Sequence, residues 1–259
     1  KYVLLENVID QDAYFIIPEV KTNVLKVINP SKCIIWWESV DNYHQTYTKE
    51  IHFNGFVRSS YHLIKRILKR PYASFKLIKK VKAHLVQSYY AKNYLSKHNI
   101  NDNVYFLKDY INELYIQKES KVDLSKKENI ILYNPKKGKR ITKKIIRKFS
   151  DMKFVPLINM TNIEVQENLA KAKVYIDFGS HPGMDRFPRE AALMHCCIIT
   201  NKCGSAKFYE DVPIEGKYKF NDYHLNYKML RNTIENCFND YMKCDKEFDH
   251  YRDFIKVQF

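Results

Sequence analysis

The stretch Gly179–Glu190 (GSHPGMDRFPRE) concentrates residue types that bind anions and move protons. A histidine beside a carboxylate can exchange protons, an arginine can bind a phosphate, and glycines let backbone approach a ligand closely. A strand-to-helix connection does not itself require this mixture, so we expect a ligand site here. The alternative is a structural or solvated role for the histidine. The candidate catalytic residues are His181, Asp185 and Arg186, and the candidate binding residues are Gly179, Ser180 and Gly183.

A second candidate loop is the basic segment Asn134–Arg140 (NPKKGKR), between an apolar run and an amphipathic one. Backbone N–H groups at a helix N-terminus favour an anion, and Gly138 permits a tight turn there. Lys136, Lys137 and Lys139 add the positive charge that a diphosphate would need. The spacing excludes a P-loop of the GxxxxGK[ST] type. The alternative interpretation is a solvated basic turn.

The elements that position these loops alternate between strand and helix. Short apolar runs predict strands at 129–133, 154–157, 173–178 and 196–200, and amphipathic runs predict helices at 141–149, 161–172 and 189–194. Thr161 and Glu164 have the spacing of a capping box. Glu190 is expected on the first turn of its helix, where a carboxylate suits the helix dipole. This order predicts a parallel sheet with helices on both faces and ligands at the carboxyl ends of its strands.

The N-terminal part follows a similar pattern. Apolar and aromatic runs predict strands at 12–17, 32–37, 83–87 and 104–107. Ser88 is expected to cap a helix that continues to Ser96, and a further basic helix is expected within 74–82. Ser60–Arg70 predicts a basic amphipathic helix that ends at Pro71.

The net charge of +15 over 259 residues is unevenly distributed. Residues 51–101 contain eleven Lys and Arg and no Asp or Glu, and residues 121–149 contain eleven basic and two acidic residues. A genome rich in A and T would raise lysine everywhere, but it would not remove the acidic residues from one stretch. The window 51–101 therefore predicts a surface for an anionic partner.

Composition and cysteine usage exclude several protein classes. A hydrophobic share of 45%, six Gly and six Cys rule out a disordered chain, a collagen and a disulfide scaffold. The cysteines form no C-x-x-C pair, which indicates reduced thiols and a cytoplasmic protein. No apolar run reaches the length of a membrane span.

At this point the segment Leu169–Glu210 resembles the donor-binding half of GT-B glycosyltransferases. Glu190-Ala191-Ala192 is similar to the helix-opening Glu-Ala segment of that family, Cys197–Thr200 to the strand that follows, and Gly204-Ser205 to the next turn. The resemblance is greatest to bacterial enzymes of O-antigen, capsule and lipopolysaccharide gene clusters. Further similar stretches are WWESVDNY at 36–43, QSYYAKNYL at 87–95, LKDYIN at 107–112, NIILYNPKKG at 129–138 and NMT at 159–161.

The resemblance implies roles for individual residues. Glu190 would contact the ribose of a nucleotide sugar, the lysines at 136, 137 and 139 its diphosphate, and Gly179–Arg186 the diphosphate and sugar. The other implied donor-binding residues are Asn159, Thr161 and Ser205. Many retaining members carry a Glu eight positions before the helix-opening Glu, where this chain has Pro182. Either Asp185 or His181 supplies the missing polar contact, or the sugar is held differently.

The resemblance also implies the architecture, which is a GT-B fold of two Rossmann-like domains with parallel sheets. We expect an acceptor-side domain over residues 1–122, a donor-binding domain over 123–240 and a C-terminal helix over 241–259. Complete GT-B enzymes are longer, and their first strand leads into a Gly-containing loop. Since no Gly precedes Gly55 here, we expect the N-terminal domain to be incomplete.

The function that follows is metal-independent transfer of a sugar, of the hexosyltransferase kind, from a nucleotide sugar to a glycan or lipid-linked acceptor in surface polysaccharide biosynthesis. No cofactor is expected, and no metal site, since the donor loops offer no compact acidic cluster. The window 51–101 would meet an anionic membrane surface, which places the enzyme on the inner face of the membrane. The alternatives are a non-catalytic GT-B-like binding protein and a nucleic-acid-binding module. The second is disfavoured because no recognition motif is present and the remainder of the chain is acidic.

Overall fold

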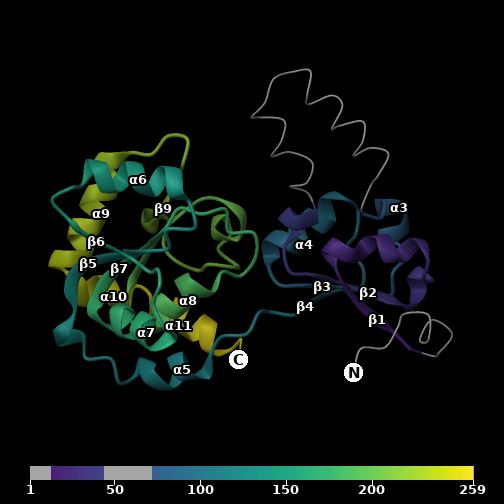
Figure 1. Cartoon of the computed structure of the whole chain (residues 1–259), viewed down its shortest axis with the longest axis horizontal. Helices are drawn as coiled ribbons and strands as arrows, with labels where there is room; N and C mark the ends of the chain where they lie inside the picture. Colours follow the sequence, from purple (N-terminus) through teal and green to yellow (C-terminus); the bar gives the residue numbers. More distant parts are fainter. Residues whose placement is uncertain (1–12, 44–71, 259) are drawn as a thin grey trace. The chain divides into compact units, whose positions relative to one another are not determined.

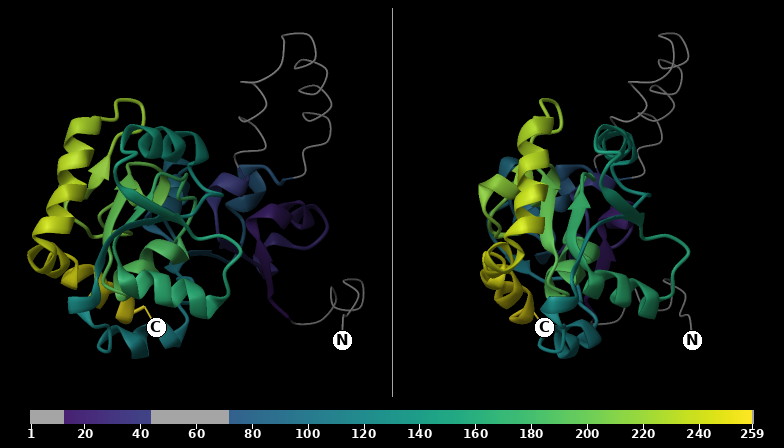
Figure 2. Two further views of the ribbon diagram at one scale, coloured as in Figure 1. Left: turned by 60° about the vertical axis from the view of Figure 1, so that its left-hand side comes forward. Right: turned by 90° about the vertical axis from the view of Figure 1, so that its left-hand side faces the viewer.

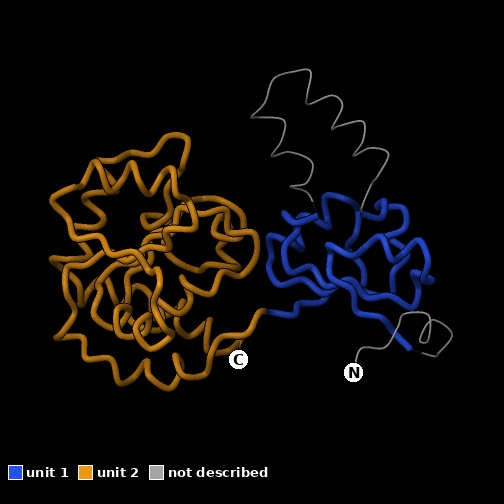
Figure 3. Tube along the Cα trace, in the orientation of Figure 1, with its two compact units in different colours: residues 1–108 blue, residues 109–259 orange. Residues whose placement is uncertain are grey.

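The structure, a computed structural model of the chain, describes residues 13–43 and 72–258. The chain divides into two compact units, and the boundary in the sequence lies between Lys108 and Asp109 (Figure 3). Among the described residues, no helix is long and apolar enough to cross a membrane. The basic helix predicted for Ser60–Arg70 lies outside the described residues.

Unit 1 is built on four parallel strands in the order β1-β2-β3-β4 (Figure 1). Its elements are β1 (Phe15–Pro18), β2 (Cys33–Trp37), β3 (Ala83–Val86), β4 (Val104–Phe106), α3 (Phe75–Ile78), α4 (Tyr89–Lys97) and the 3-10 helices Glu19–Lys26 and Pro30–Lys32. The four predicted strands are therefore confirmed. The Ser88 hydroxyl accepts a hydrogen bond from the Ala91 amide at 3.1 Å, which confirms the predicted helix cap.

The basic helix expected within 74–82 is confirmed as the short helix α3, which covers four residues. The reason is strand pairing. The Lys82 amide donates to the Cys33 carbonyl at 2.8 Å, so the chain must already be turning into the sheet where the helix was expected to continue.

Aromatic side chains fill the core of unit 1. Trp37 is fully buried, and its indole N–H donates to Nδ1 of His84 at 3.1 Å. Burial lowers the pKa of His84 to about 4, so its ring is neutral and can accept that bond. The rings of Tyr43 and Tyr94 pack around the same indole. The two apolar runs at 33–37 and 83–86 are thereby joined by a polar contact within the core.

Unit 2 contains five parallel strands in the order β6-β5-β7-β8-β9 (Figure 1). The strands are β5 (Glu128–Tyr133), β6 (Lys153–Pro156), β7 (Ala172–Asp177), β8 (Cys197–Asn201) and β9 (Lys219–Phe220). The helices are α5 (Glu113–Glu119), α6 (Lys139–Lys148), α7 (Asn162–Lys171), α8 (Arg186–Leu193), α9 (Tyr227–Asn239), α10 (Tyr241–Lys246) and α11 (Asp249–Lys256). Three 3-10 helices cover Leu124–Lys126, Gly204–Lys207 and Gly216–Tyr218. The predicted doubly covered parallel sheet is confirmed.

Helices cover both faces of this sheet (Figure 2). On one face lie α7 and α8, with α5 and α11 packed against α8, and on the other lie α6 and α9. Strands β7 and β8 are central, and nearly all of their side chains are buried. This is the reason that both read as continuous apolar runs rather than as alternating ones. The capping box predicted at Thr161 and Glu164 is present at the start of α7.

The division of the chain differs from the one expected. Residues 109–122 were assigned to the first domain, but Ile111 and Tyr115 pack into the core of unit 2. The expected C-terminal helix over 241–259 is two helices, α10 and α11, whose Tyr251 and Ile255 belong to the same core. An apolar stripe on a short helix does not reveal which core it joins, and this is why the sequence misplaced both segments.

A buried lysine ties three elements of unit 2 together. The Lys127 ammonium donates to the carbonyl oxygens of Leu169 at 3.0 Å, Ala172 at 2.8 Å and Met194 at 2.5 Å. These carbonyls lie at the C-terminal ends of α7 and α8 and at the start of β7. Burial lowers the pKa of Lys127, because a buried charge loses its hydration. The three carbonyl contacts offset part of that loss.

Replacing Lys127 by Met should lower the free energy of unfolding by about 2–4 kcal/mol, because three buried carbonyls lose their donor. Lys126→Met is the matched control, since its ammonium is exposed and pairs with the exposed Asp123. It should change the free energy by less than about 1 kcal/mol. Urea denaturation followed by circular dichroism measures both, and equal effects would show that Lys127 has no special structural role.

Candidate functional site

The connectivity of unit 2 marks one place on its sheet edge as a ligand site. After β5 the chain passes to β6 on one side of the sheet, and after β7 it passes to β8 on the other side. The loops that follow the neighbouring strands β5 and β7 therefore run in opposite directions. Such a switch point leaves a crevice at the carboxyl ends of the strands. The two loops concerned, residues 134–138 and 178–185, are the two that the sequence indicated.

The two loops lie in direct contact. Gly138 has a φ of +56°, and a Cβ there would lie 2.2 Å from the Phe178 carbonyl oxygen. A Cβ on Gly179 would lie 3.2 Å from the Cβ of Lys137. At position 138 only glycine allows this approach, and the lack of a side chain at Gly179 leaves room for the Lys137 side chain against the loop after β7.

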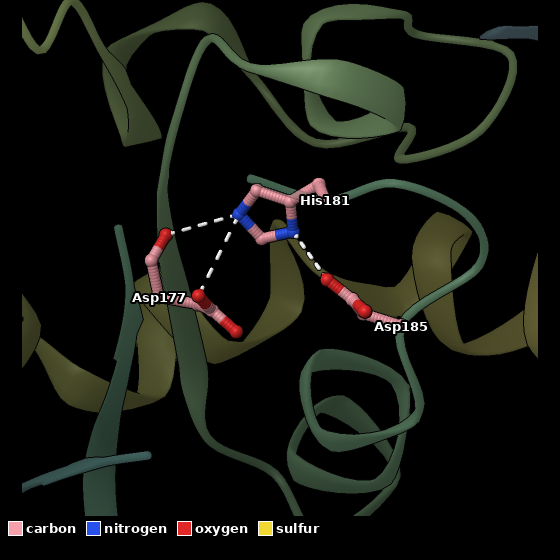
Figure 4. Close-up of side chains that lie close together, drawn as sticks. All are labelled: Asp177, His181 and Asp185. Carbon is pink, nitrogen blue, oxygen red and sulfur yellow. Dashed lines mark hydrogen bonds and ion pairs between the residues drawn. The ribbon is translucent and has the colours of Figure 1, made fainter. Parts of the chain in front are cut away.

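Four charged groups then meet in a row, as Figure 4 shows for three of them. The His181 ring lies between two carboxylates, with Nδ1 at 2.9 Å from Asp185 Oδ2 and Nε2 at 3.7 Å from Asp177 Oδ1. Nε2 is also 3.2 Å from the Asp177 carbonyl oxygen. The Lys137 ammonium pairs with the other carboxylate oxygen of Asp185. We call Lys137, Asp177, His181 and Asp185 the charge cluster.

The electrostatics of the charge cluster are those of alternating charges. Burial opposes protonation of His181, but Asp185 and Asp177 outweigh it and raise the pKa of the ring. Burial would raise the pKa of Asp185, yet His181 and Lys137 hold it below its usual value. Burial raises the pKa of Asp177, with His181 opposing. The cluster is thus two carboxylates neutralised by an imidazolium and an ammonium.

The loop that carries the cluster is fastened from the neighbouring strand end. The Ser205 amide donates to the His181 carbonyl at 2.8 Å, and the Ser205 hydroxyl donates to the Gly183 carbonyl at 2.7 Å. The Asn201 amide nitrogen donates to the Gly179 carbonyl at 2.7 Å and to Asp222 at 2.8 Å. These bonds hold His181 at a φ of +43°, in the left-handed region that glycine favours. Ser205, predicted to bind the donor, thus uses its hydroxyl to shape the loop.

Arg189 fastens the other side of the same loop. It is almost fully buried, and its guanidinium donates to the carbonyls of Met184 at 3.1 Å and Asp109 at 3.0 Å, and more weakly to Asp185. Burial lowers the pKa of the guanidinium. The Arg189 side chain therefore binds both this loop and Asp109, the first residue of unit 2.

Helix α8 starts three residues earlier than expected, at Arg186 instead of Arg189. Pro188, which was placed in the loop, lies at the third helical position, where its missing N–H costs nothing. Asp185 occupies the N-cap position, but its carboxylate makes no capping bond because Lys137 and His181 draw it away. The first-turn N–H groups of α8 are consequently not capped by this side chain.

Glu190 is therefore on the second turn of α8, which corrects the expectation that it lies on the first. It is 8% exposed and bonds to the hydroxyl of Tyr115 on α5. Burial raises its pKa, while Arg186 and Arg189 oppose the shift. Tyr115 was not singled out in the sequence, since a tyrosine within an amphipathic helix gives no signal of such a contact.

The remaining predicted residues lie around the cluster with less burial. The side chains of Lys136, Lys139, Ser180 and Arg186 are exposed, whereas Lys137 is turned inward. Asn159 and Thr161 follow β6, and Thr161 is engaged in capping α7. Within the part of the chain that the structure describes, no hydrogen bond or ion pair joins either of them to the charge cluster. Their proposed contact with a donor stays a prediction.

The expectation that the donor loops offer no compact acidic cluster is wrong. Single ligand atoms of Asp177, His181 and Asp185 lie within 4.8 Å of one another, a spacing that could hold a metal ion. Asp177 was read as part of the strand, and the sharp turn at His181 brings it close to Asp185.

A small cavity lies behind the cluster. Its lining includes His181, Asp185, Arg189, Thr200 and Ser205. Its volume of about 10 Å³ admits a single water molecule. A cavity of this volume cannot hold a sugar.

Comparison with known proteins gives a fold but no sequence family. No protein-family model and no curated protein matches the chain. Among solved structures, Anabaena HepE in complex with UDP matches with a TM-score of 0.59 at 12% identity, over 95% of this chain and 75% of that chain. WaaG, a glycosyltransferase involved in lipopolysaccharide biosynthesis, matches with a TM-score of 0.53 at 15% identity, over 94% and 74%. A glycosyltransferase from Rickettsia africae matches with a TM-score of 0.51 at 13% identity, over 96% and 95%.

The chain has a GT-B fold. The fold class predicted from the sequence is thereby confirmed, and so is the resemblance at the level of the fold. HepE, which was also solved with UDP-glucose, matches in that form over 88% of this chain and 68% of its own length. Within the GT-B fold, the charge cluster occupies the switch point of the second of its two sheets.

Three residues that hold the loop of the charge cluster were missed. Asp177, Arg189 and Asn201 hold the loop after β7, yet only Asp177 offered a signal, as a carboxylate at the end of an otherwise apolar strand. Arg189 belongs to the stretch Gly179–Glu190, but nothing in the sequence distinguishes its role from that of Arg186. Asn201 lies at the end of a strand whose pattern predicts burial, without indicating what the amide would bind.

Substituting Gly138 by Ala should separate the two loops, because the new methyl group would collide with the Phe178 carbonyl and oppose a φ of +56°. We expect a loss of stability of about 1–3 kcal/mol, measured by thermal denaturation. Gly216→Ala is the control, since a Cβ at Gly216 meets no atom within 4 Å. If the two variants have the same melting temperature, the loops do not make the contact described.

Proposed function

We propose that the chain is a glycosyltransferase that takes a sugar from a nucleotide-sugar donor. The support is that the two loops of the switch point carry an inward-turned lysine, a glycine at a tight turn and the N-terminus of α8, which has no side-chain cap. Each of these groups favours an anion, and together they fit the diphosphate of a nucleotide sugar. The UDP and UDP-glucose bound to the similarly folded HepE support the same donor class.

The observation that carries the proposal is the position of Lys137. Of the three lysines indicated in the loop after β5, it alone turns toward the loop after β7, while Lys136 and Lys139 are exposed. A cation at this point would stabilise the charge that develops on the diphosphate as the bond to the sugar breaks. Arg186, the first residue of α8, can add to this from its exposed position. Glu190 is the candidate for the ribose.

This chemistry needs no metal ion, because the lysine, the arginine and the helix N-terminus supply the positive potential. We therefore propose metal-independent transfer of the hexosyltransferase kind. His181 and Asp185 remain the candidate catalytic residues beside Arg186. A protein that binds a nucleotide sugar without transferring it would have the same site, and only turnover separates the two.

Replacing Lys137 by Ala should weaken the binding of a nucleoside diphosphate by about tenfold and lower donor turnover by about a hundredfold. Titration calorimetry with UDP, GDP and CMP measures the binding, and release of free sugar from the corresponding nucleotide sugars measures the turnover. Lys144→Ala is the matched control, because Lys144 is an exposed lysine of α6 outside the loop. Equal affinity of the Lys137→Ala variant and the unaltered chain would refute the diphosphate site.

The acceptor side is proposed on broader grounds. We propose a glycan or lipid-linked acceptor in surface polysaccharide biosynthesis, met at an anionic membrane surface, and the role of the similarly folded WaaG in lipopolysaccharide biosynthesis supports this. Part of the basic window 51–101 lies outside the described residues. The six basic residues of the window that the structure describes are all exposed, namely Lys76, Lys79, Lys80, Lys82, Lys92 and Lys97.

Changing Lys79 and Lys80 together to Gln should reduce binding to vesicles that contain phosphatidylserine by about thirtyfold, at about 1 kcal/mol for each lysine. Co-sedimentation at moderate salt measures it. The control is the pair Lys143→Gln and Lys144→Gln, which removes two exposed lysines from the other basic window. If the unaltered chain does not sediment with these vesicles, the membrane proposal fails.

A further inference from the structure

Three cysteine thiols form a row in the core of unit 2. Cys197 is the first residue of β8, Cys237 lies in α9 and Cys244 lies in α10. The thiol of Cys237 is the middle one and is hydrogen-bonded to both of the others. We call these three residues the thiol row. It begins at the amino end of β8, whereas the charge cluster lies at the carboxyl ends of the strands, so the proposed function does not use it.

Helices α9 and α10 bring two members of the thiol row together. Only Asp240 separates the two helices in the sequence, and α10 packs against α9. Sγ of Cys244 lies 3.6 Å from the carbonyl oxygen of Asn236, the residue before Cys237. Contact between the two sulfur atoms is the first requirement for a disulfide bond. None of the six cysteines, all of which lie within the described residues, is in such a bond.

Polar contacts fix the position of α10 in this pair. The Tyr241 hydroxyl donates to the carbonyl of His195 at 2.7 Å. Asp245, the residue after Cys244, pairs with the His195 ring at 3.0 Å and with Arg252 at 3.0 Å. These bonds hold α10 to the turn before β8 and to α11, so Cys244 keeps its place beside α9.

The members of the thiol row differ in exposure and in acidity. Cys197 and Cys237 are fully buried, whereas Cys244 keeps 6% of its surface exposed. A hydrogen bond with Cys237 lowers the pKa of Cys244 to about 6, although burial opposes this shift. Hydrogen bonds with Cys197 and Cys244 raise the pKa of Cys237. Since the thiolate is the nucleophile, Cys244 is the member that a dissolved oxidant meets first and reacts with.

We propose that Cys244 and Cys237 are a site of reversible oxidation, at which a low-molecular-weight disulfide such as oxidised glutathione converts the two thiols into a disulfide bond between α9 and α10. This inference goes beyond the proposed function and holds whether or not the chain transfers a sugar.

The reaction consists of two thiol–disulfide exchanges. The Cys244 thiolate attacks one sulfur of the small disulfide, forms a mixed disulfide with it and releases one small thiolate. The Cys237 sulfur then attacks the sulfur of Cys244, and the second small thiolate leaves with the proton of Cys237. The two protein thiols are oxidised by two electrons, and the small disulfide is reduced to two thiols. An excess of reduced glutathione reverses both steps.

The experiment is incubation of the full chain with oxidised glutathione, alkylation of the remaining thiols with iodoacetamide, and digestion with trypsin without reduction. Trypsin cuts after Lys243, between the two cysteines. The expected product joins the peptides 232–243 and 244–246, with their summed mass less two hydrogen atoms. Dithiothreitol should separate the peptides again. The oxidised chain should melt about 5 °C above the reduced one, because the bond restricts the unfolded chain.

Three variants assign the steps to individual thiols. Cys244→Ser should form neither the linked peptide nor the mixed disulfide. Cys237→Ala keeps the core apolar and should stop at the mixed disulfide on Cys244, because the second thiol is missing. Cys33→Ser is the matched control, since it removes a buried thiol of unit 1 and should form the bond at the rate of the unaltered chain. Circular dichroism shows that each variant is folded before the oxidation is measured.

Other outcomes contradict the proposal. A product that joins the peptides 190–202 and 232–243 would show that Cys197, not Cys244, is the partner of Cys237. The absence of any linked peptide from the folded, unaltered chain would show that the thiol row is inert. An oxidised chain that melts below the reduced one would show that the two sulfur atoms are not placed for bonding. Each of these results overturns the assignment and leaves the proposed function untouched.

Discussion

The backbone contact between Gly138 and the Phe178 carbonyl fixes the distance between two loops that leave neighbouring strands in opposite directions. A Cβ at position 138 would lie 2.2 Å from the Phe178 carbonyl oxygen, so a side chain there would push the loops apart. Every later feature of the site needs this contact, because it brings Lys137 from the loop after β5 to Asp185 in the loop after β7. The strand order makes the two loops run in opposite directions, and the glycines allow their backbones to come close together.

The charge cluster depends on burial as much as on charge. Asp177 and His181 are nearly inaccessible, so neither could stay ionised without the other. The cost of the left-handed backbone at His181 is met by the amide of Ser205, which binds the carbonyl that this conformation exposes. At His181, a hydrogen bond thus holds the strained backbone, and opposite charges compensate the burial of the ring. The only member of the row that remains partly open beside Lys137 is Asp185.

The sequence predicted the fold well because the strands of unit 2 are short apolar runs between polar turns, and a run such as 173–178 has few other interpretations. It also located both loops, since glycine, proline and charge are unusual together after a buried strand. It could not predict the cluster itself, because Asp177 and Asp185 meet only through the turn at His181. Nor could it distinguish Lys137 from Lys136 and Lys139, whose difference arises from the direction in which a tight turn presents each side chain.

The guanidinium of Arg189 binds the backbone of Asp109, the first residue of unit 2, as well as the loop beneath Asp185. If the chain is divided into two halves, this contact of Arg189 indicates that the second half should begin no later than Asp109. A second half that starts at residue 123 would lack the carbonyl that Arg189 binds, the Tyr115 hydroxyl beside Glu190 and two apolar members of the core. A half that starts at Asp109 keeps all of them, so the segment before β5 belongs with the loops of the charge cluster in any exchange of halves between proteins of this fold.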